Sequence, residues 1–267
     1  MTKSVLITGA SQGSGRAAAL LFAEQGYNVA IAARQSDRLE AVAAEIIARG
    51  QRVMALPTDV SQADQVEALV NKALAEFGQI DVLVNNAGIC LTGQVSDMSL
   101  ADWHQLMDVN FWGYVHTIHY LLPHLVQRGS GVIVNVGSFG GKMPLPLMTA
   151  YCASKYAVSG LTETLRLELQ GKGIHVAAVH PGVINSSFME RAMFRGQDET
   201  QANQQRDRMQ AVLSQAWVSQ PEDVAQAIWA AVDQRKDEIV VGPAAIATEA
   251  YRLLPGLTQW ALARAAL

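Results

Sequence analysis

A chain of 267 residues with a formal net charge of −4 has no basic surplus with which to hold a nucleic-acid backbone, so nucleic acid is not an expected partner. Half of the residues are hydrophobic and 16% are charged, which is typical of a water-soluble globular protein and excludes a disordered chain. Charged or turn residues interrupt every apolar stretch before the ~20 residues that a membrane span needs, and no signal peptide is recognisable, so the expected location is cytoplasmic.

Seven short segments rich in β-branched residues recur along the chain, and longer stretches with helical spacing separate them. The short segments cover 5–7, 29–32, 53–56, 82–84, 132–136, 176–179 and 239–241. The helical stretches include 17–25, 39–48, 66–77, 150–170 and 224–232. Continuously apolar strands that alternate with helices predict a parallel sheet with helices on both faces. We therefore expect a single α/β domain over residues 1–267, built on a doubly wound parallel seven-stranded sheet.

Two segments depart from this alternation. The stretch over about 186–215 is polar and rich in glutamine, whereas the tail over about 244–267 is apolar. The large apolar side chains of the tail exceed what one exposed helix face normally carries. They are Leu253, Leu254, Leu257, Trp260, Leu262 and Leu267. We expect subunit packing to cover this surface, with peripheral membrane contact as the second explanation.

A glycine-rich turn connects the first expected strand to the first helical stretch. It contains Gly9, Gly13 and Gly15, with Ser11, Gln12 and Ser14 between them. Glycine allows positive φ and a close approach of the backbone to a pyrophosphate, and the N-terminus of the following helix favours an anion. A tight turn between strand and helix also needs glycine for purely structural reasons, so the turn alone leaves both interpretations open.

Polar and small residues also follow the third and fourth expected strands. Asp59 and Val60 come after the third, where the aspartate is able to cap a helix or to bind an adenine edge. Asn86, Ala87 and Gly88 come after the fourth, where small residues allow the backbone to approach the same ligand. Each pattern has a structural alternative when it is taken alone.

Together these motifs resemble the single-domain branch of the short-chain dehydrogenase/reductase superfamily, over roughly residues 3–187. The branch's TGxxxGxG turn matches the glycine turn from Thr8 onward, its NNAG motif matches 85–88, and its adenine-side aspartate matches Asp59. Ser14 departs from the apolar residue that is usual inside the turn. The resemblance implies a Rossmann-type fold, a dinucleotide cofactor and a homodimer or homotetramer.

The residue after the second expected strand predicts which dinucleotide is bound. NAD enzymes of the family place an acid there, whereas this chain has Ala33 followed by Arg34. Arg34 is able to pair with the 2′-phosphate of NADP(H), and Ser11 is able to add a neutral hydrogen bond. NADP(H) is therefore favoured. Gln12 replaces a basic residue that many NADP-preferring relatives have, so NAD(H) is not excluded.

Four residues match the catalytic set of the superfamily. Tyr151 and Lys155 form a YxxxK pair on one helix face, Ser138 ends the fifth expected strand, and Asn110 lies in the helix before that strand. A ketone that receives hydride develops negative charge on its oxygen, which Tyr151 as proton donor and Ser138 as second hydrogen-bond partner would serve. The Lys155 ammonium is expected to lower the tyrosine pKa. By resemblance, Lys155 also binds the nicotinamide ribose, and Asn110 holds a water that relays protons.

Further residues downstream complete the expected site. By resemblance, Pro181, Gly182, Ile184 and Ser186 belong to the segment that contacts the nicotinamide amide, with serine in place of the usual threonine. Family members have a substrate lid at about 186–215, and its large apolar side chains suggest an apolar substrate such as a lipid, steroid or aromatic ketone. Those side chains are Phe188, Met189, Met193 and Phe194, joined by Leu145, Pro146, Leu147 and Met148 before the tyrosine.

Several other interpretations are set aside. Cys90 and Cys152 are expected to be buried free thiols. His116 and His119 are able to share a helix face, but two ligands without a third do not predict a metal site. The main alternative to an enzyme is a noncatalytic NADP(H)-binding Rossmann sensor, and such proteins typically lack an intact tyrosine–lysine pair. Turnover of a small-molecule ketone or secondary alcohol distinguishes the two.

Overall fold

The main sheet of the computed structural model, which describes residues 2–185, 192–213 and 218–265, has seven parallel strands. They are β1 (Ser4–Thr8), β2 (Asn28–Ala33), β3 (Val53–Pro57), β4 (Val82–Asn85), β6 (Gly131–Val136), β7 (Ile174–Pro181) and β9 (Glu238–Val241). The strand order is β3-β2-β1-β4-β6-β7-β9. The predicted doubly wound sheet is confirmed, and all seven expected strands are present.

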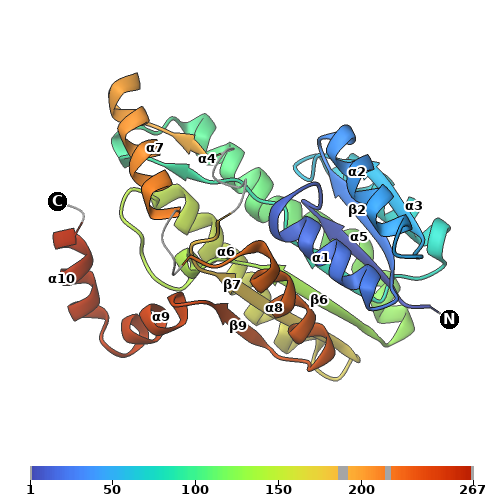
Figure 1. Cartoon of the computed structure of the whole chain (residues 1–267). Helices are drawn as coiled ribbons and strands as arrows, with labels where there is room; N and C mark the ends of the chain where they lie inside the picture. The colour runs from blue at the N-terminus through green and yellow to red at the C-terminus, as the bar shows by residue number, and fades with distance from the viewer. Residues whose placement is uncertain (1, 186–191, 214–217, 266–267) are drawn as a thin grey trace.

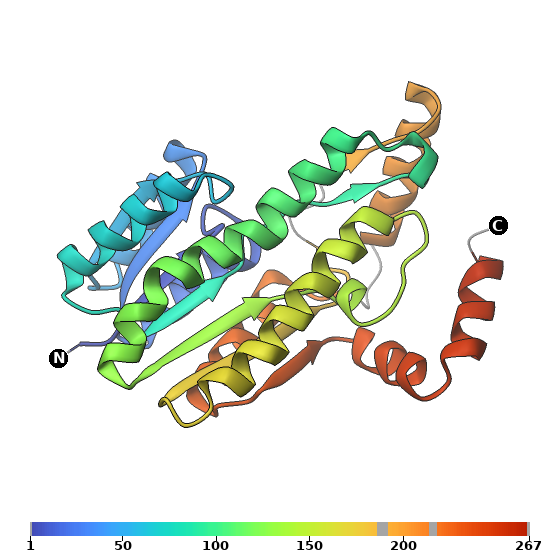
Figure 2. The same ribbon diagram turned by 180° about the vertical axis from the view of Figure 1, so that it is seen from behind.

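Helices cover both faces of this sheet (Figures 1 and 2). One face packs against α1 (Gly13–Glu24), α2 (Ser36–Ile47) and α8 (Pro221–Asp233). The other packs against α3 (Ala63–Phe77), α5 (Gly113–Arg128) and α6 (Thr149–Leu169). Because all seven strands are parallel, their carboxyl ends lie at the same edge of the sheet. The strand order reverses between β1 and β4, and ligands of open α/β sheets bind at the carboxyl edge near such a reversal.

Smaller elements surround the carboxyl edge of the sheet. A two-stranded ribbon consists of β5 (Leu91–Thr92) and β8 (Met193–Phe194), and helices α4 (Leu100–Met107) and α7 (Glu199–Leu213) lie beside it (Figure 1). The 3-10 turns η1 (Val95–Asp97) and η3 (Phe139–Gly141) and the π-helix η2 (Asp108–Trp112) complete this region. The polar stretch at 186–215 therefore contains β8 and α7, and residues 186–191 and 214–215 lie outside the described chain.

The apolar tail forms α9 (Ala244–Leu253) and α10 (Pro255–Ala265). Both views show α10 standing apart from the body of the molecule (Figures 1 and 2). Among the described residues, no helix is both long and apolar enough to cross a membrane.

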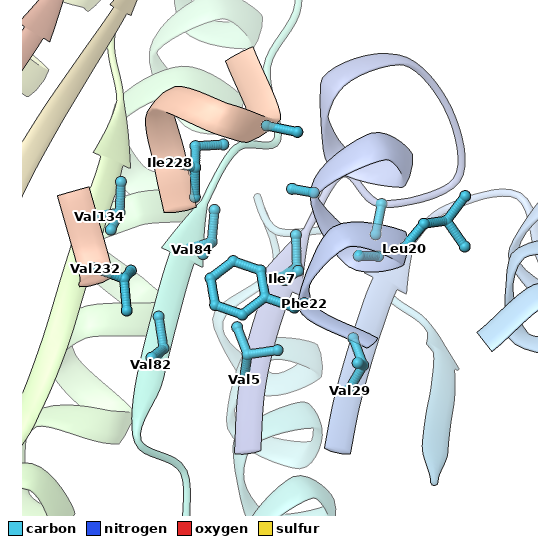
Figure 3. Close-up of a cluster of buried hydrophobic side chains, with 14 of the residues drawn as sticks. Val5, Ile7, Leu20, Phe22, Val29, Val82, Val84, Val134, Ile228 and Val232 are labelled. Atoms are coloured by element: carbon cyan, nitrogen blue, oxygen red, sulfur yellow. The ribbon is translucent and has the colours of Figure 1, made fainter. Parts of the chain in front are cut away.

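The largest buried cluster joins α1 and α8 to the strands between them, and Figure 3 shows part of it. Phe22 is fully buried and packs edge-to-face against Tyr27 and Trp229, with ring centroids 5.2 and 5.4 Å apart. Edge-to-face packing is favourable because the positive edge of one ring meets the negative face of the other. These contacts hold α8 on the sheet next to α1, the helix that follows the glycine turn.

Replacing Phe22 with alanine should lower the free energy of unfolding by about 3–5 kcal/mol, because it leaves a cavity and removes both ring contacts. Urea denaturation measures the change, and Ile47→Ala, which truncates a side chain that is 62% exposed, is the control and should cost less than about 0.5 kcal/mol. Equal losses in the two variants would contradict the packing described here.

Candidate active site

Hydrogen bonds clamp the carboxyl ends of β1 and β4 to each other. The Thr8 hydroxyl accepts hydrogen bonds from the main-chain N–H groups of Asn86 and Ala87, both at 3.1 Å. In return the Asn86 amide donates to the carbonyls of Thr8 and Gly9, at 3.0 and 3.3 Å. The glycine turn and the NNAG motif, 78 residues apart in sequence, therefore form one rigid unit. The side chain of Asn86 braces this unit.

The glycines of the turn are required by its geometry. Gly9 and Gly13 have positive φ values of 68° and 54°, which other residues rarely adopt. A Cβ at Gly15 would lie 2.3 Å from the Gly9 carbonyl oxygen, so only glycine allows the first turn of α1 to pack this closely. The N-terminus of α1 consequently faces the space beyond the strands, where its free N–H groups favour an anion.

A cavity of about 400 Å³ extends from this turn to the end of β7. It collects every predicted cofactor and catalytic residue within the described chain except Asn110. These lining residues are Gly9, Ser11, Gln12, Gly13, Ser14, Gly15, Arg34, Asp59, Val60, Asn86, Ala87, Gly88, Ser138, Tyr151, Lys155, Pro181, Gly182 and Ile184. The predicted contact at Ser186 lies outside the described residues.

The end of the cavity near β2 is positively charged. Arg34 is exposed and makes no hydrogen bond or ion pair with any described residue, so its guanidinium is available to a ligand. The side-chain oxygen of Gln12 accepts a hydrogen bond from Arg38 of α2, and its Nε2 is buried without a partner among the described residues. A buried donor without a partner beside a helix N-terminus fits a phosphate-bearing group. Sequence analysis missed Arg38, although it lies four residues after Arg34, in the first turns of α2.

At the other end of the cavity, the side chains of Ser138, Tyr151 and Lys155 converge. Ser138 begins the η3 turn, and its hydroxyl oxygen accepts a hydrogen bond from the Gly140 N–H at 3.1 Å, which leaves its own proton free to donate. Ser138 also hydrogen-bonds the Tyr151 phenol. Lys155, one helical turn after the tyrosine on α6, donates to the Val136 carbonyl at 3.0 Å.

Asn110 lies behind the cavity, in the π-helix between α4 and α5. Its Oδ1 accepts from the Ile89 N–H at 2.8 Å, and its Nδ2 donates to the Ile89 carbonyl and the Ser154 hydroxyl, both at 3.0 Å. Because both amide protons are in use, the side chain joins the π-helix to α6 and to the segment after Gly88. The expected water relay through Asn110 stays a prediction.

Burial dominates the ionisation of the tyrosine and the lysine. It raises the pKa of Tyr151 above its ordinary value, and the hydrogen bond from Ser138 opposes the rise only in part. Burial also lowers the pKa of Lys155 to about 8. The net pKa of Tyr151 in the chain by itself is thus set mainly by its removal from water, and the expected lowering by Lys155 stays a prediction. A phenol that stays protonated near neutral pH is suited to donating a proton.

The β5–β8 ribbon packs beside the site, in the buried apolar cluster that contains Tyr151. Arg195, directly after β8, makes a two-pronged ion pair with Asp102 of α4, with N–O distances of 2.6 and 3.1 Å. The Arg195 guanidinium holds the pKa of the Asp102 carboxyl below its usual range. The ribbon is thereby anchored to α4 by charge as well as by main-chain pairing.

The expected lid residues have mixed positions. Phe194 is buried in an apolar cluster with Tyr151 and Leu106, and Met193 packs against that cluster, so both contribute to packing and neither lines the cavity. Of the loop before the tyrosine, Leu145, Pro146 and Met148 line the cavity, whereas Leu147 turns outward and is 40% exposed. Phe188 and Met189 lie outside the described residues.

The remaining candidates are the two cysteines and the histidines of α5. Cys90 and Cys152 are buried free thiols, as predicted, and burial raises the pKa of Cys90 to about 12, which keeps the thiol protonated. Within the part of the chain that the structure describes, no three His, Cys, Asp or Glu side chains are grouped as metal ligands would be. His116 instead contacts the Val60 carbonyl.

Comparison with protein families and curated proteins agrees with this arrangement. The sequence profile described as short chain dehydrogenase matches residues 3–198. Over 189 residues the chain is 42% identical to the 3-oxoacyl-acyl-carrier-protein reductase FabG of Staphylococcus epidermidis, covering 70% of this chain and 78% of that protein. Over 190 residues it is 40% identical to sulfoacetaldehyde reductase 2 of Chromohalobacter salexigens, covering 70% and 75% of the two proteins.

Solved structures extend the similarity to nearly the whole chain. A short chain dehydrogenase/reductase from Burkholderia phymatum in complex with NAD superimposes with a TM-score of 0.86 at 29% identity, covering 94% of this chain and 95% of that one. An alcohol dehydrogenase from Thermococcus sibiricus complexed with 5-hydroxy-NADP gives a TM-score of 0.77 at 28% identity, covering 91% and 97%.

The pKa of Lys155 leads to a testable pH profile. If the charged ammonium is required, kcat/KM should fall as the pH rises through about 8, because deprotonation removes the charge. Steady-state rates between about pH 6 and 10 measure this limb. Lys155→Arg is the matched variant, since a guanidinium stays charged throughout the range, and its basic limb should disappear or move upward. A wild-type profile that is flat above pH 8 would contradict the requirement.

Proposed function

The chain belongs to the short chain dehydrogenase family and is an oxidoreductase; on that premise we propose that it transfers a hydride between NADP(H) and a ketone or secondary alcohol with an apolar body. The observation that carries the proposal is the convergence of the Ser138 and Tyr151 hydroxyls at one end of a cavity whose other end holds the unpaired Arg34.

The catalytic roles follow from which groups hold protons. The cofactor, when bound, supplies or accepts the hydride at the substrate carbon. Tyr151 donates its phenolic proton to the substrate oxygen, because burial keeps that proton in place near neutral pH. Ser138 donates a second hydrogen bond to the same oxygen, since its bond from the Gly140 N–H uses an acceptor site of the hydroxyl and not its proton. Lys155 holds a positive charge beneath the tyrosine and binds the nicotinamide ribose.

The preference for an apolar substrate rests on the cavity wall near Tyr151. Apart from Lys155, the charged residues of the described lining are Arg34 and Asp59, and both belong to the cofactor end. Around Tyr151 the wall is apolar and comprises Cys90, Val109, Phe139, Leu145, Pro146, Met148, Val183 and Ile184. A carbonyl compound with a charged group would find no partner on this wall, whereas an apolar body replaces water there favourably.

The preference for NADP(H) rests on Arg34 and on the Gln12–Arg38 contact beside it. Arg34 lines the end of the cavity where the adenine ribose would bind, and Arg38 contacts Gln12 at that end. The residue before Arg34 is alanine, which leaves room for a phosphate. A guanidinium binds phosphate through charge-assisted hydrogen bonds. Related proteins have been solved with NAD and with an NADP analogue, so residues of this chain, and not its family, decide the preference.

Assembly into a homodimer or homotetramer is the third part of the proposal. On α9 and α10, Leu253, Leu254, Leu257 and Trp260 are each more than half exposed. A helix of eleven residues is marginal in water without tertiary packing. A second copy of the chain that covers this surface would remove the apolar side chains from water.

Turnover with a ketone panel tests the reaction directly. With NADPH and a panel of aliphatic, aromatic and charged ketones, absorbance at the reduced-nicotinamide band should fall, most rapidly with apolar ketones. Tyr151→Phe should reduce kcat by about a thousandfold or more while changing the Kd of NADPH little, because it removes only the proton donor. Tight NADPH binding without turnover on any member of the panel would instead indicate a sensor.

The cofactor preference is tested by substitutions that remove the positive charge after β2 and then add a negative one. Arg34→Leu should weaken NADPH binding about tenfold or more and leave NADH binding almost unchanged. Adding Ala33→Asp should reverse the preference, because the carboxylate accepts the ribose hydroxyls of NADH and repels the 2′-phosphate. Arg49→Leu, which removes an arginine paired with Glu24 on the surface, is the control and should leave both Kd values unchanged. Equal affinity for both cofactors in the wild type would refute the role of Arg34.

The oligomer is tested by light scattering. The wild-type chain should have a mass of two or four copies, and Leu257→Ser with Trp260→Ser should shift it toward one copy, because the double variant removes apolar area from the interface. Ile47→Ser, on the exposed side of α2, should leave the mass unchanged. A wild-type chain that stays monomeric at high concentration contradicts the assembly.

A further inference from the structure

Three polar side chains behind Ser138 form a closed hydrogen-bonded circuit. His180, near the end of β7, contacts the Ser138 carbonyl oxygen through Nδ1 at 3.2 Å and a Glu238 carboxylate oxygen through Nε2 at 3.0 Å. Lys142, which follows the η3 turn, contacts the same carboxylate oxygen at 2.6 Å. Both ends of the short segment from Ser138 to Lys142 are therefore tied to one carboxylate on β9. None of these three side chains was singled out by sequence.

The imidazole ring of His180 is buried, and the residue at position 137 must be small to leave room for it. His180 is only 1% exposed. A Cβ at Gly137 would lie 2.5 Å from its Nδ1 and 2.8 Å from its Cε1, so no larger residue fits at position 137 while the ring holds this place. The glycine before Ser138 is thus explained by the histidine on the neighbouring strand β7.

The contacts determine where the protons on the ring must be. A main-chain carbonyl oxygen and a carboxylate oxygen both accept hydrogen bonds, and neither donates one. For the ring to donate to both acceptors at once, each ring nitrogen must hold a proton, which is the imidazolium form. Glu238 supplies the opposite charge, since its pKa is lowered to about 2 by the hydrogen bonds from His180 and Lys142.

We propose that His180, protonated on both ring nitrogens and paired with Glu238, is a positioning residue that fixes the main chain at Ser138 and so aims the serine hydroxyl. The inference rests on the proposed role of Ser138 in the reaction. His180 itself does not line the cavity, so it acts through the serine.

The link from the histidine to the serine hydroxyl runs through the η3 turn. The Ser138 carbonyl accepts from the Gly141 N–H at 2.9 Å as well as from His180, and the Ser138 hydroxyl accepts from the Gly140 N–H at 3.1 Å. The carbonyl and the hydroxyl are thus held by consecutive residues of one turn. A rotation of the Ser138 peptide would change both contacts and displace the hydroxyl from Tyr151, and small displacements of this kind are costly to catalysis.

Charged groups around the ring determine how the circuit responds to substitution. Glu238 faces it from β9, Lys142 approaches from the end of η3, and Glu163 of α6 reaches Lys142 at 3.8 Å. Asp237 precedes Glu238 but pairs with Arg166 and His175 instead. Glu238→Gln therefore removes the charge next to His180, and Asp237→Asn is a matched control that removes the neighbouring charge.

The first experiment reads the protonation state without any turnover. In protein labelled with ¹⁵N-histidine at pH 7, without cofactor, both ring nitrogens of His180 should give the signals of protonated nitrogens, assigned by their loss in His180→Asn. Glu238→Gln should convert one nitrogen to the unprotonated type, whereas Asp237→Asn should not. A neutral His180 ring in the wild type overturns the proposal, whatever the enzyme's activity.

The second experiment separates positioning from general stability. His180→Leu should lower kcat about tenfold, with the Kd of NADPH changed less than about twofold. His180→Asn should recover most of the loss, because its amide nitrogen is able to take the place of Nδ1 and donate to the Ser138 carbonyl. Equal kcat in the leucine and asparagine variants, with equal losses of thermal stability, assigns His180 to packing and overturns the proposal.

A third pair of variants tests the fit between residue 137 and the ring. Gly137→Ala should lower kcat in the wild-type background, because the new Cβ displaces the imidazole. In a His180→Ala background the same substitution should have almost no further effect. Additive losses would contradict the coupling. If instead Tyr151→Phe and Ser138→Ala both retained turnover, the proposed reaction would fail while the protonation result for His180 still stood.

Discussion

The clamp between Thr8 and the Asn86–Ala87 segment is the interaction on which the rest of the site depends. It joins the two halves of the sheet where the strand order reverses, and it uses a hydroxyl and an amide whose hydrogen-bonding capacity is directed at main-chain groups. With the clamp in place, the glycine turn, the end of β2 and the ends of β6 and β7 face one cavity. The chemistry of the protein is therefore positioned by main-chain geometry before any reactive side chain is considered.

Burial shifts the pKa values of Tyr151 and Lys155 in opposite directions. Tyr151 and Lys155 are both removed from water, which disfavours the charged form of each, so the phenol stays protonated and the ammonium loses its proton near pH 8. In the chain without cofactor, this arrangement favours proton donation by the tyrosine over proton abstraction by it. Groups at the edge of the cavity, such as Arg34, remain solvated and free to meet a ligand.

Apolar periodicity was sufficient for the fold, because it reports directly on main-chain geometry, whereas most of the predicted site residues came from the resemblance to the family. Lining residues such as Val109, Phe139 and Val183 were not predicted, since no local pattern places them at the cavity. Arg38 and His180 were missed, since their importance comes from contacts with Gln12 and Ser138 that no local pattern contains. The rise of the Tyr151 pKa was not expected, because a spacing of four residues reports proximity to Lys155 but not the cost of burial. Met193 and Phe194 resembled pocket residues in composition, yet they pack against the core.

The 78-residue separation between Thr8 and Asn86 has a consequence for the order of folding. No N-terminal fragment that ends before the NNAG motif is able to close the glycine turn, because the partner of the turn has not yet been made. Contacts that are distant in sequence form late and at a large cost in chain entropy. The glycine turn therefore closes only once the NNAG motif has been made, and a cofactor that binds there would stabilise the folded state alone. The cellular supply of the dinucleotide would then influence how much of the newly made protein persists.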